Sequence, residues 1–319
     1  MNKQSKPVVS VIMAVKDGEK YLRQAVDSIV QQTFHDFEFI IINDCSTDGS
    51  MKILNEYTDR RLRIYSNEEN IGLTRSLNIA LGYARCEYIA RMDADDICLP
   101  DRFKMQVNFL NAHPDVSVVG TGFMMIEEDG TPIREGHFPM DDDLIRWALC
   151  FYNPIVHPSV MMRLSTIKQV GGYDPALAQS QDYDLWWRLS FISKLANLES
   201  IFVFLRQHPG QITSVHRNNQ FERGTKIDQR HLSRVLGKPI SEDTIRKLWF
   251  SEFGNLGDAL AACKLILDYS TNILKHVQSY SQRTIIKKDE KSRIRSIMTQ
   301  FARNQSWYMV LRAFFLRKD

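Results

Sequence analysis

Residues 87–96 read EYIARMDADD, an apolar segment that ends in three carboxylates within four positions. The apolar part, Glu87–Met92, has the length of a buried strand and is too short for a buried helix. Asp93, Asp95 and Asp96 follow it at once. Carboxylates this close repel one another, and folding them together is costly without a cation. The segment therefore predicts a strand with a charged, functional end.

Oxygen-rich clusters of this kind suit Mg²⁺ or Mn²⁺, which also bind substrate phosphates. The alternative is that one acid caps the segment before Pro100 and the others are solvated. The strand directly before the acids favours the metal, with Asp95 as a ligand.

The chain before this segment alternates between short apolar runs and amphipathic stretches. Strands are predicted at Val8–Val15, Phe37–Ile42, Leu62–Tyr65 and Glu87–Met92. Helical spacing of apolar residues lies between them, for example over Tyr21–Val30 and Leu73–Ala84. This order predicts an α/β fold with parallel strands and helices on both faces. Ligands bind beyond the carboxyl ends of such strands, so Asp44 should share a rim with Asp93.

Later elements are a strand at Val116–Val119, a hairpin over Met124–Arg134, and helices from about Ser241 onward. Gly237-Lys238-Pro239 interrupts the helical pattern of apolar residues, because Gly and Pro favour breaks between elements. We therefore expect a domain over residues 1–237 and a helical region over 238–319.

Composition excludes several classes of protein. The 319 residues are 44% hydrophobic and 25% charged, as in soluble globular proteins. The five cysteines are scattered, which disfavours a disulfide framework or a zinc site and favours a reducing cytoplasm. The first residues lack a signal-peptide core, and no apolar run reaches the ~18 residues of a membrane span. Motifs typical of NTPases, Rossmann dehydrogenases, zinc proteases and serine hydrolases are absent.

The net charge of +3 is unevenly distributed, because residues 281–319 carry +7 and the remainder −4. Near the end, Trp307, Leu311, Phe314 and Phe315 recur on one helical face among basic residues. A basic amphipathic helix can lie on an anionic membrane. The alternative is packing on the catalytic domain or on a sister subunit. Nucleic acid is not expected as a partner.

Two further segments could bind a nucleotide. Asp44 ends a strand and could accept hydrogen bonds from a base or ribose, or cap a helix. Asn70-Ile71-Gly72 opens a helix, where backbone amides and Arg75 would favour a diphosphate. The alternative for this segment is an ordinary turn with a solvated arginine.

The second half of the chain offers candidates for acid–base chemistry and for an acceptor pocket. Asp182 stands beside Trp186 and Trp187, and apolar neighbours raise the pKa of a carboxyl group, as a general base requires. The alternative is an exposed acid beside a buried tryptophan. His208 could complete a carboxylate–metal site. An acceptor pocket could involve the residues His157, Gly172, Tyr173 and Trp186.

In order along the chain, these residues resemble bacterial members of glycosyltransferase family 2, which have the GT-A fold. The matching motifs cover roughly residues 7–215: Val9-Ser10-Val11-Ile12-Met13-Ala14, Gln31-Gln32-Thr33, Asp44-x-Ser46-x-Asp48-Gly49, Asn70-x-Gly72, Asp93-x-Asp95-Asp96 and Gln181-Asp182-Tyr183-Asp184-Leu185-Trp186. The resemblance implies a GT-A mixed sheet with flanking helices, followed here by a C-terminal helical extension.

By the same resemblance, the reaction would be an inverting transfer from a nucleotide diphosphate sugar, usually a UDP-sugar. Asp182 would be the catalytic base, and Asp95 with His208 would hold Mn²⁺ or Mg²⁺. The donor nucleotide would contact Ala14, Glu19, Asp44, Asn70, Gly72, Arg75, Asp93 and Ala94. The acceptor would be a saccharide or a lipid-linked saccharide for a capsule or O-antigen, made in the cytoplasm, with residues 281–319 on the inner membrane face.

The chain departs from the family pattern at a few positions. Lys16 and Asp17 stand where members often have Asn, and Gln181 replaces the commoner Glu. The Q-x-x-R-W signature of processive members is absent, which favours a single addition. Two other functions remain open, a sugar nucleotidyltransferase and a non-catalytic nucleotide-sugar binding protein. Val15-Lys16-Asp17-Gly18 is a poor version of the nucleotidyltransferase loop.

Overall fold

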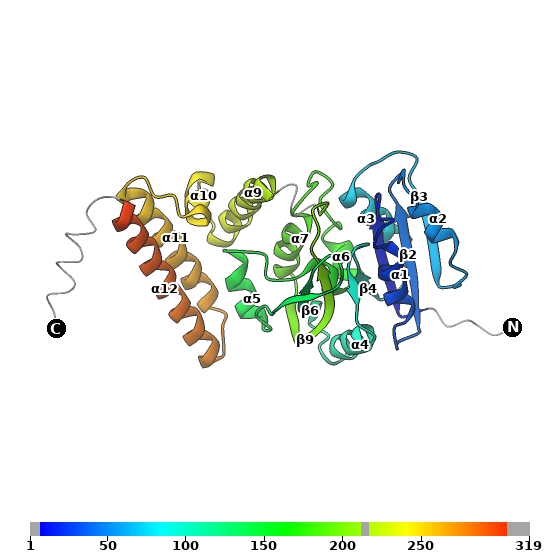
Figure 1. The fold of residues 1–319 in the computed structure, drawn as a ribbon. Coiled ribbons are helices and arrows are strands. Elements are labelled where there is room, and N and C mark those ends of the chain that lie inside the picture. Colours follow the sequence, from blue (N-terminus) through cyan, green and yellow to red (C-terminus); the bar gives the residue numbers. More distant parts are fainter. Residues whose placement is uncertain (1–6, 212–216, 305–319) are drawn as a thin grey trace. The chain divides into compact units, whose positions relative to one another are not determined.

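The computed structural model describes residues 7–211 and 217–304. The first of these ranges contains a mixed β-sheet (Figure 1). The strand order is β3-β2-β1-β4-β8-β6-β9-β5, with β7 paired to β6. The strands are β1 (Val9–Val15), β2 (Phe37–Asn43), β3 (Leu62–Ser66), β4 (Tyr88–Arg91), β5 (Ile97–Cys98), β6 (Val116–Ile126), β7 (Pro132–Gly136), β8 (Met161–Arg163) and β9 (Lys194–Arg206).

The first four strands are parallel and confirm the predicted β/α alternation. β1 pairs with β2 on one side and with β4 on the other, and β3 pairs with β2. Because β1, β2 and β4 are parallel neighbours, Asp44 and Asp93 follow strands that end at the same edge, as predicted. The sheet becomes mixed at β8, which runs antiparallel to β4 and β6.

Helices cover both faces of the sheet, as predicted. The helices of this part are α1 (Leu22–Val30), α2 (Ser50–Asn55), α3 (Leu73–Tyr83), α4 (Arg102–Ala112), α5 (Asp142–Leu149), the short η1 (His157–Ser159), α6 (Leu164–Gln169) and α7 (Gln181–Ser190). Alternate residues of β1, such as Val9 and Val11, join a core with apolar residues of α1 and α4. Ile12 and Ile40 point to the opposite face, where α3 contacts β1 and β2. Burial of these β-branched runs explains why they form central strands.

Three strands were missed in the sequence, and β5 is the shortest of them, with two residues. β8 has only three residues, too few for a periodic signal. β9 is long, but its pairing with β6 is interrupted by register shifts that break the alternation of apolar and polar residues. The predicted hairpin at Met124–Arg134 is confirmed, with Gly130 at a φ of 96° in its turn.

The chain divides into two compact units, one of residues 1–145 and 153–217, the other of residues 146–152 and 218–319. The second unit contains α9 (Arg217–Leu236), α10 (Glu242–Phe250), α11 (Leu256–Leu274) and α12 (Tyr280–Asn304), which agrees with the expected helical region. The division lies before the predicted boundary at residue 237. The reason is that α9 packs with later helices, for instance where Asn272 Nδ2 donates to Val235 O at 3.2 Å. Gly237 marks only the end of α9, with a φ of 64°.

Within the described residues, no helix is both long and apolar enough to cross a bilayer. The apolar residues Trp307, Leu311, Phe314 and Phe315 of the predicted amphipathic tail lie outside the described residues.

Candidate active site

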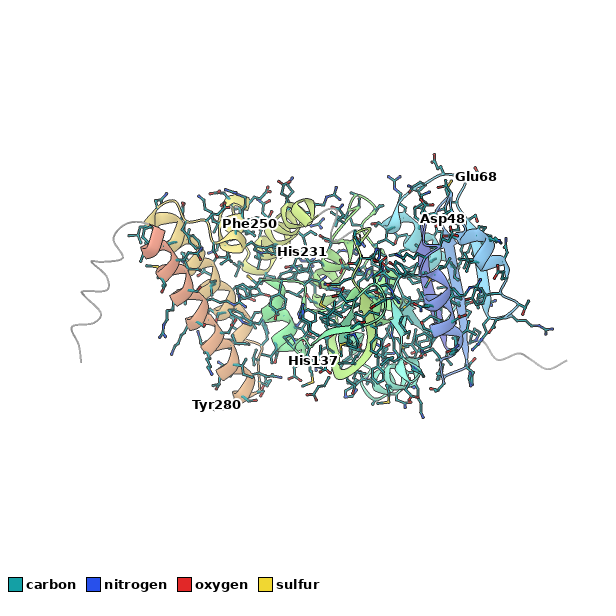
Figure 2. The ribbon with its side chains drawn as sticks, in the orientation of Figure 1. Asp48, Glu68, His137, His231, Phe250 and Tyr280 are labelled. Atoms are coloured by element: carbon teal, nitrogen blue, oxygen red, sulfur yellow. The ribbon has the colours of Figure 1, made fainter. Side chains whose placement is uncertain are left out.

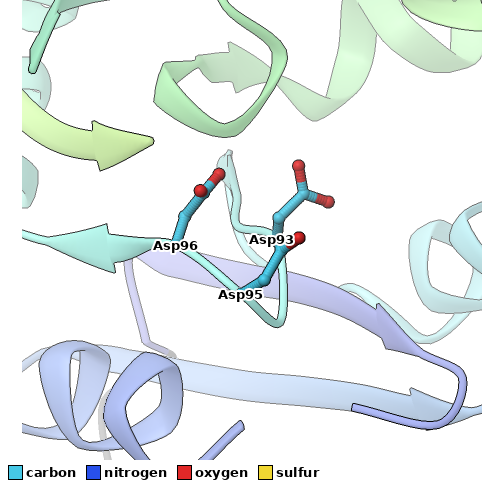
Figure 3. Close-up of side chains that lie close together, drawn as sticks. All are labelled: Asp93, Asp95 and Asp96. Carbon is cyan, nitrogen blue, oxygen red and sulfur yellow. The ribbon is translucent and has the colours of Figure 1, made fainter. Parts of the chain in front are cut away.

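The three acids after β4 form one cluster, as the sequence predicts. The carboxylates of Asp93, Asp95 and Asp96 offer oxygen atoms that all lie within 4.8 Å of one another. Figure 3 shows them around the turn that links β4 to β5. Among the described residues this is the one group of three or more acids, histidines or cysteines close enough to hold a metal ion.

Each acid of the cluster has a different protein partner. Asp93 pairs with the guanidinium of Arg91, a side chain only 1% exposed. Asp95 Oδ2 lies 2.9 Å from His208 Nε2. Asp96 Oδ1 accepts a hydrogen bond of 2.9 Å from the backbone N–H of Arg206 and is buried. The side chains of Asp93 and Asp95 stay about one-third exposed, at 31% and 29%. Asp93 and Asp95 are therefore accessible to a ligand, whereas the buried Asp96 stabilises the fold through its hydrogen bond.

The electrostatics of the cluster suit a bound cation. Burial, followed by the charges of Asp95 and Asp93, raises the pKa of Asp96 well above its ordinary value. The pKa of Asp93 is also raised, chiefly by desolvation, and Arg91 opposes that shift. The single positive charge of Arg91 cannot neutralise three carboxylates. The excess negative charge therefore suits a divalent ion such as Mg²⁺ or Mn²⁺.

Arg206 ties the cluster to the rest of the rim. Its buried guanidinium donates from Nε to Asp95 O at 3.1 Å and from Nη1 to Glu128 O at 2.7 Å. It also lies 4.8 Å from the ring centroid of Tyr21, whose ring packs on His208. Donors and a cation–π contact thus hold the end of β9 against the acids.

Asp182 lies at the start of α7. The residue before that helix, Ser180, has a left-handed φ of 57°, a conformation that L-residues rarely adopt outside functional or strained sites. Asp182 Oδ2 accepts a hydrogen bond of 2.7 Å from Asn153 Nδ2. Desolvation raises the pKa of Asp182, while the hydrogen bonds from Tyr183 N–H and Asn153 oppose the shift. Its neighbour Asp184 is fully buried and pairs with Arg188 at 2.7 Å, so Asp184 is structural.

The charge of Asp182 acts on the β4 cluster. The charge of Asp182 raises the pKa of Asp93, and Arg91 lowers the pKa of both carboxyl groups. The Nε and Nη1 atoms of Arg91 are buried and have no hydrogen-bond partner among the described residues. The buried guanidinium of Arg91 therefore pairs with the carboxylate that follows β4 and also lowers the pKa of the carboxyl group at the start of α7.

The residues predicted for the acceptor pocket lie together. His157 Nε2 is 2.8 Å from the hydroxyl of Tyr173, and the His157 ring packs edge-on against Trp186 with centroids 6.1 Å apart. Burial and then Arg91 lower the pKa of His157 well below its ordinary value, so the imidazole is neutral. Tyr173 and Trp186 are fully buried, so they pack behind His157 and do not present a free surface. Their contact with an acceptor stays a prediction.

Gly172 has a positive φ of 74°, and a Cβ there would lie 2.8 Å from Asn78 Oδ1. Asn78 exchanges two hydrogen bonds with the backbone of Tyr173, at 2.8 and 3.0 Å. The glycine turn is thus pinned to α3 and does not behave as a free loop.

On the nucleotide side, Asp44 organises the loop before α3. Its carboxylate accepts hydrogen bonds from Asn67 Nδ2 at 2.8 Å and from the backbone N–H groups of Ile71 and Gly72 at 3.0 and 2.8 Å. Gly72, the N-cap of α3, has a φ of 86°. Asn70 and Arg75 are exposed on this loop and the following helix. These donors use three of the about four acceptor positions of a carboxylate, and contact of the buried Asp44 with a base stays a prediction.

The loops after β1 and β2 are bonded to each other. Asp17 Oδ1 accepts from Thr47 N–H at 2.7 Å, and Glu19 Oε2 accepts from Gly49 N–H at 2.8 Å. Asp48, labelled in Figure 2, accepts from the backbone N–H of Glu19 at 2.8 Å. Lys16, the departure noted above, donates to Cys45 O.

Three further residues predicted to contact the nucleotide differ in exposure. Ala14 is partly buried near the end of β1, and Glu19 is exposed on the loop that follows. Ala94 is partly buried within the β4–β5 turn. All three therefore lie on the rim to which β1, β2 and β4 lead, and their contact with a nucleotide stays a prediction.

Sequence reasoning missed Arg91, Asn153 and Arg206 as parts of the site. Arg91 carried a signal, because an arginine inside a buried strand must find a counter-charge. Asn153 carried none, since its role depends on a contact with Asp182, 29 positions away. Arg206 ends a strand that was itself missed.

Comparison with known proteins agrees with this geometry. The glycosyl transferase family 2 model matches residues 10–164. An "uncharacterized glycosyltransferase" of Haemophilus influenzae is 33% identical over 73% of this chain and 75% of its own. The O-antigen biosynthesis glycosyltransferase WbnJ of Escherichia coli is 41% identical over 57% of this chain and 71% of its own.

Among solved structures, S. aureus TarS 1-349 in complex with UDP-GlcNAc superposes with a TM-score of 0.62 at 18% identity, covering 94% of this chain and 92% of TarS. This likeness extends the shared fold over nearly the whole chain. Together with the ordered motifs and the carboxylate site, the comparisons show that the chain belongs to glycosyl transferase family 2 and is a glycosyltransferase.

Proposed function

We propose that the protein transfers a single sugar, with inversion, from a nucleotide diphosphate donor to a hydroxyl of a saccharide or lipid-linked saccharide. The observation that carries this proposal is that the chain holds a cluster of three carboxylates, Asp93, Asp95 and Asp96, together with a separate carboxylate, Asp182, that Asn153 holds and whose charge acts on Asp93. The cluster offers charge for a diphosphate–metal complex, and Asp182 offers a carboxylate base. An inverting transfer needs these two elements on opposite sides of one reacting carbon.

Asp182 acts as the general base in this proposal. Its carboxylate takes the proton of the acceptor hydroxyl while that oxygen bonds to the anomeric carbon, and the bond from this carbon to the diphosphate oxygen breaks. Asn153 holds the carboxylate in place through the 2.7 Å hydrogen bond, so that one oxygen remains for the acceptor. A raised pKa makes Asp182 a stronger base than an exposed aspartate.

Asp95 and Asp93 would hold Mn²⁺ or Mg²⁺, because their side chains are accessible and lie in one cluster. His208 lies against Asp95 and could join as a ligand through Nε2. When bound, the ion neutralises charge that grows on the departing diphosphate. Asp96 stays bonded to Arg206 and fixes the turn that presents the other two acids.

The donor is proposed to be a UDP-sugar, a choice supported by the likeness of the fold to TarS, whose structure holds UDP-GlcNAc. The pocket for the base would lie over Asp44, with its one remaining acceptor position, and the diphosphate would approach the Gly72 end of α3. Arg75 is exposed on the first turn of this helix and supplies a cation.

The product is proposed to be a bacterial surface polysaccharide, an O-antigen or a capsule, because WbnJ is an O-antigen enzyme. A lipid-linked acceptor would bring the enzyme to the inner face of the cytoplasmic membrane. In support, Lys288, Lys291 and Arg295 are exposed along one side of α12. Such a basic side would favour an anionic leaflet.

A screen of UDP-, GDP- and dTDP-sugars with Mn²⁺ tests the proposal. Thermal shift measures binding, and release of the nucleoside diphosphate measures slow hydrolysis. We expect a UDP-sugar to raise the melting temperature and to be hydrolysed, with both effects lost on adding EDTA. Failure of every donor to stabilise the protein or to be hydrolysed would refute the donor assignment.

A further inference from the structure

His208 lies in a turn beyond the end of β9, yet its side chain is mostly covered. β9 ends at Arg206, and in the turn that follows Gln211 N–H donates to His208 O at 3.3 Å. Side chains on such surface turns are usually solvated, but the His208 side chain is only 15% exposed. The ring that packs on it belongs to Tyr21, with ring centroids 4.9 Å apart. His208 therefore depends on a residue from the start of the chain.

Tyr21 is itself fixed from several sides. It directly precedes α1, is 8% exposed, and its backbone N–H donates to Gly18 O at 3.1 Å. Its hydroxyl donates to Glu128 Oε1 at 2.7 Å, on the turn between β6 and β7. The guanidinium of Arg206 lies 4.8 Å from the centroid of its ring. Because both its backbone and its hydroxyl are anchored, the Tyr21 ring is a rigid surface for the imidazole.

The imidazole held in this way faces the β4 cluster. His208 Nε2 lies 2.9 Å from Asp95 Oδ2. Adjacent ligands of an octahedral ion with bonds of about 2.1 Å lie about 3 Å apart, so this nitrogen and this oxygen have the separation that a shared ion requires. Arg206, which packs on the Tyr21 ring, also donates from Nε to Asp95 O at 3.1 Å. The same contacts therefore fix the imidazole and the acid beside it.

We propose that Tyr21 is a positioning residue that holds the His208 imidazole as a ligand for the divalent ion. This inference rests on the proposed function, in which the ion binds at Asp93 and Asp95 with the donor diphosphate. Tyr21 offers no ligand atom of its own, because its hydroxyl donates to Glu128. Loss of a contact that orients a metal-binding histidine typically costs about 10–100-fold in metal affinity.

The choice of ion separates this role from a merely structural one. Mg²⁺ is a hard cation that takes oxygen ligands and dehydrates reluctantly, so a nitrogen ligand suits it less than it suits a softer transition-metal ion such as Mn²⁺. Release of the imidazole should therefore weaken Mn²⁺ binding more than Mg²⁺ binding. A general disturbance of the three acids should weaken the binding of both ions alike.

Calorimetric titration of the full chain with Mn²⁺ and, in parallel, with Mg²⁺ tests the proposal, in each case with and without UDP. We expect Tyr21→Leu to weaken Mn²⁺ binding at least about tenfold and Mg²⁺ binding less. The ratio of the two dissociation constants is a property of the folded protein, so a loss of stability does not imitate this result. Tyr21→Phe keeps the ring on His208 and should retain most of the Mn²⁺ affinity.

Tyr57→Leu is the matched control. Tyr57 is also a partly buried tyrosine whose hydroxyl donates to a carboxylate, that of Asp27 at 2.7 Å. It belongs to the contact between α1 and the end of α2, and its loss should leave the affinities for both ions unchanged.

A double variant shows whether Tyr21 acts through His208. Two residues that act on a metal ion through one ligand are non-additive, so Tyr21→Leu should have no further effect on Mn²⁺ affinity in the His208→Ala background. An undiminished effect there, or an unchanged ratio of Mn²⁺ to Mg²⁺ affinity in Tyr21→Leu, would overturn the proposal.

The same titrations separate this inference from the proposed function. Loss of Mn²⁺ binding in Asp95→Asn, with normal binding in Tyr21→Leu and His208→Ala, would overturn the role of Tyr21 and leave the proposed function intact. An unaltered chain that binds neither ion, even with UDP, would refute the metal site of the proposed function and this inference with it.

Discussion

The end of β4 and the start of α7 both present carboxylates that we assign to the proposed reaction, but they do so in different ways. At the end of β4, three acids lie within four residues, and their positions follow from one strand and one turn. At the start of α7, a single acid depends on Asn153, on the strained Ser180 and on the distant Arg91. The first region concentrates negative charge, whereas the second isolates one carboxylate.

This difference matches two different chemical demands. A cation site needs several oxygens and tolerates a repulsion that the cation later removes. A base needs one carboxylate with a raised pKa and a fixed direction. The predictions below separate the two regions, starting with the largest effect.

The largest effect should come from Asp182→Asn. The amide keeps the size of the side chain but cannot take a proton, so turnover should fall by about 10²–10⁴-fold. Steady-state kinetics with the donor found in the screen measures this loss. Asp184→Asn is a structural control, because Asp184 pairs with Arg188 in the core. The Asp184→Asn variant should be less stable, but its folded form should still carry out the proton transfer. Normal turnover of the Asp182→Asn enzyme would contradict the assignment of Asp182 as the general base.

A smaller effect should come from Asn153→Ala. Asn153 donates to the ionised carboxylate of Asp182 and so lowers its pKa. Without this donor the pKa rises further, and the acidic limb of the pH–rate profile should move by about one unit to higher pH. Activity should fall at low pH and recover well above the limb. Asn78→Ala, which frees the Tyr173 turn but not Asp182, should leave the position of the limb unchanged. If both variants shift it equally, Asn153 does not act through Asp182.

The smallest effect concerns the stability of the β4 cluster. The pKa of Asp96 is raised well above its ordinary value of 3.8, so at neutral pH its ionisation opposes folding. Asp96→Asn keeps an acceptor for Arg206 N–H and should raise stability by about 1 kcal/mol, or a few degrees. The gain should be present at neutral pH without divalent ions and should vanish as the pH falls towards the ordinary value.

Asp115→Asn is the control, because its effect on stability should have the opposite sign to that of Asp96→Asn. Lys194 lowers the pKa of Asp115, whose carboxylate therefore favours folding above its ordinary pKa. Its removal should give no gain in melting temperature at neutral pH. Equal responses of the two variants in melting experiments would mean that the β4 cluster is not electrostatically strained.

The sequence predicted the first part of the fold, from β1 to the acids after β4, closely, because the signals of this part are local. Runs such as Val8–Val15 and the acids after Met92 each predict their own structure, and the parallel order places their ends on one edge. The sequence also placed Asp95 beside His208, although only through the family resemblance.

The region around Asp182, Gly172 and Tyr173 was less predictable because its contacts join distant segments. Asp182 depends on Asn153, and the Gly172 turn depends on Asn78 of α3. Neither dependence leaves a periodic or compositional trace. Tyr173 and Trp186 show the same limit, since an aromatic side chain can line a pocket or support it, and here both are fully buried.

Donor affinity measured by calorimetry tests the central claim most directly. A UDP-sugar titrated with Mn²⁺ into the unaltered chain, Asp182→Asn and Asp95→Asn should bind the first two alike and the third much more weakly. This result would assign the cation and the donor to the end of β4 and the proton transfer to the start of α7. Equal loss of affinity in both variants, or in neither, would contradict that division.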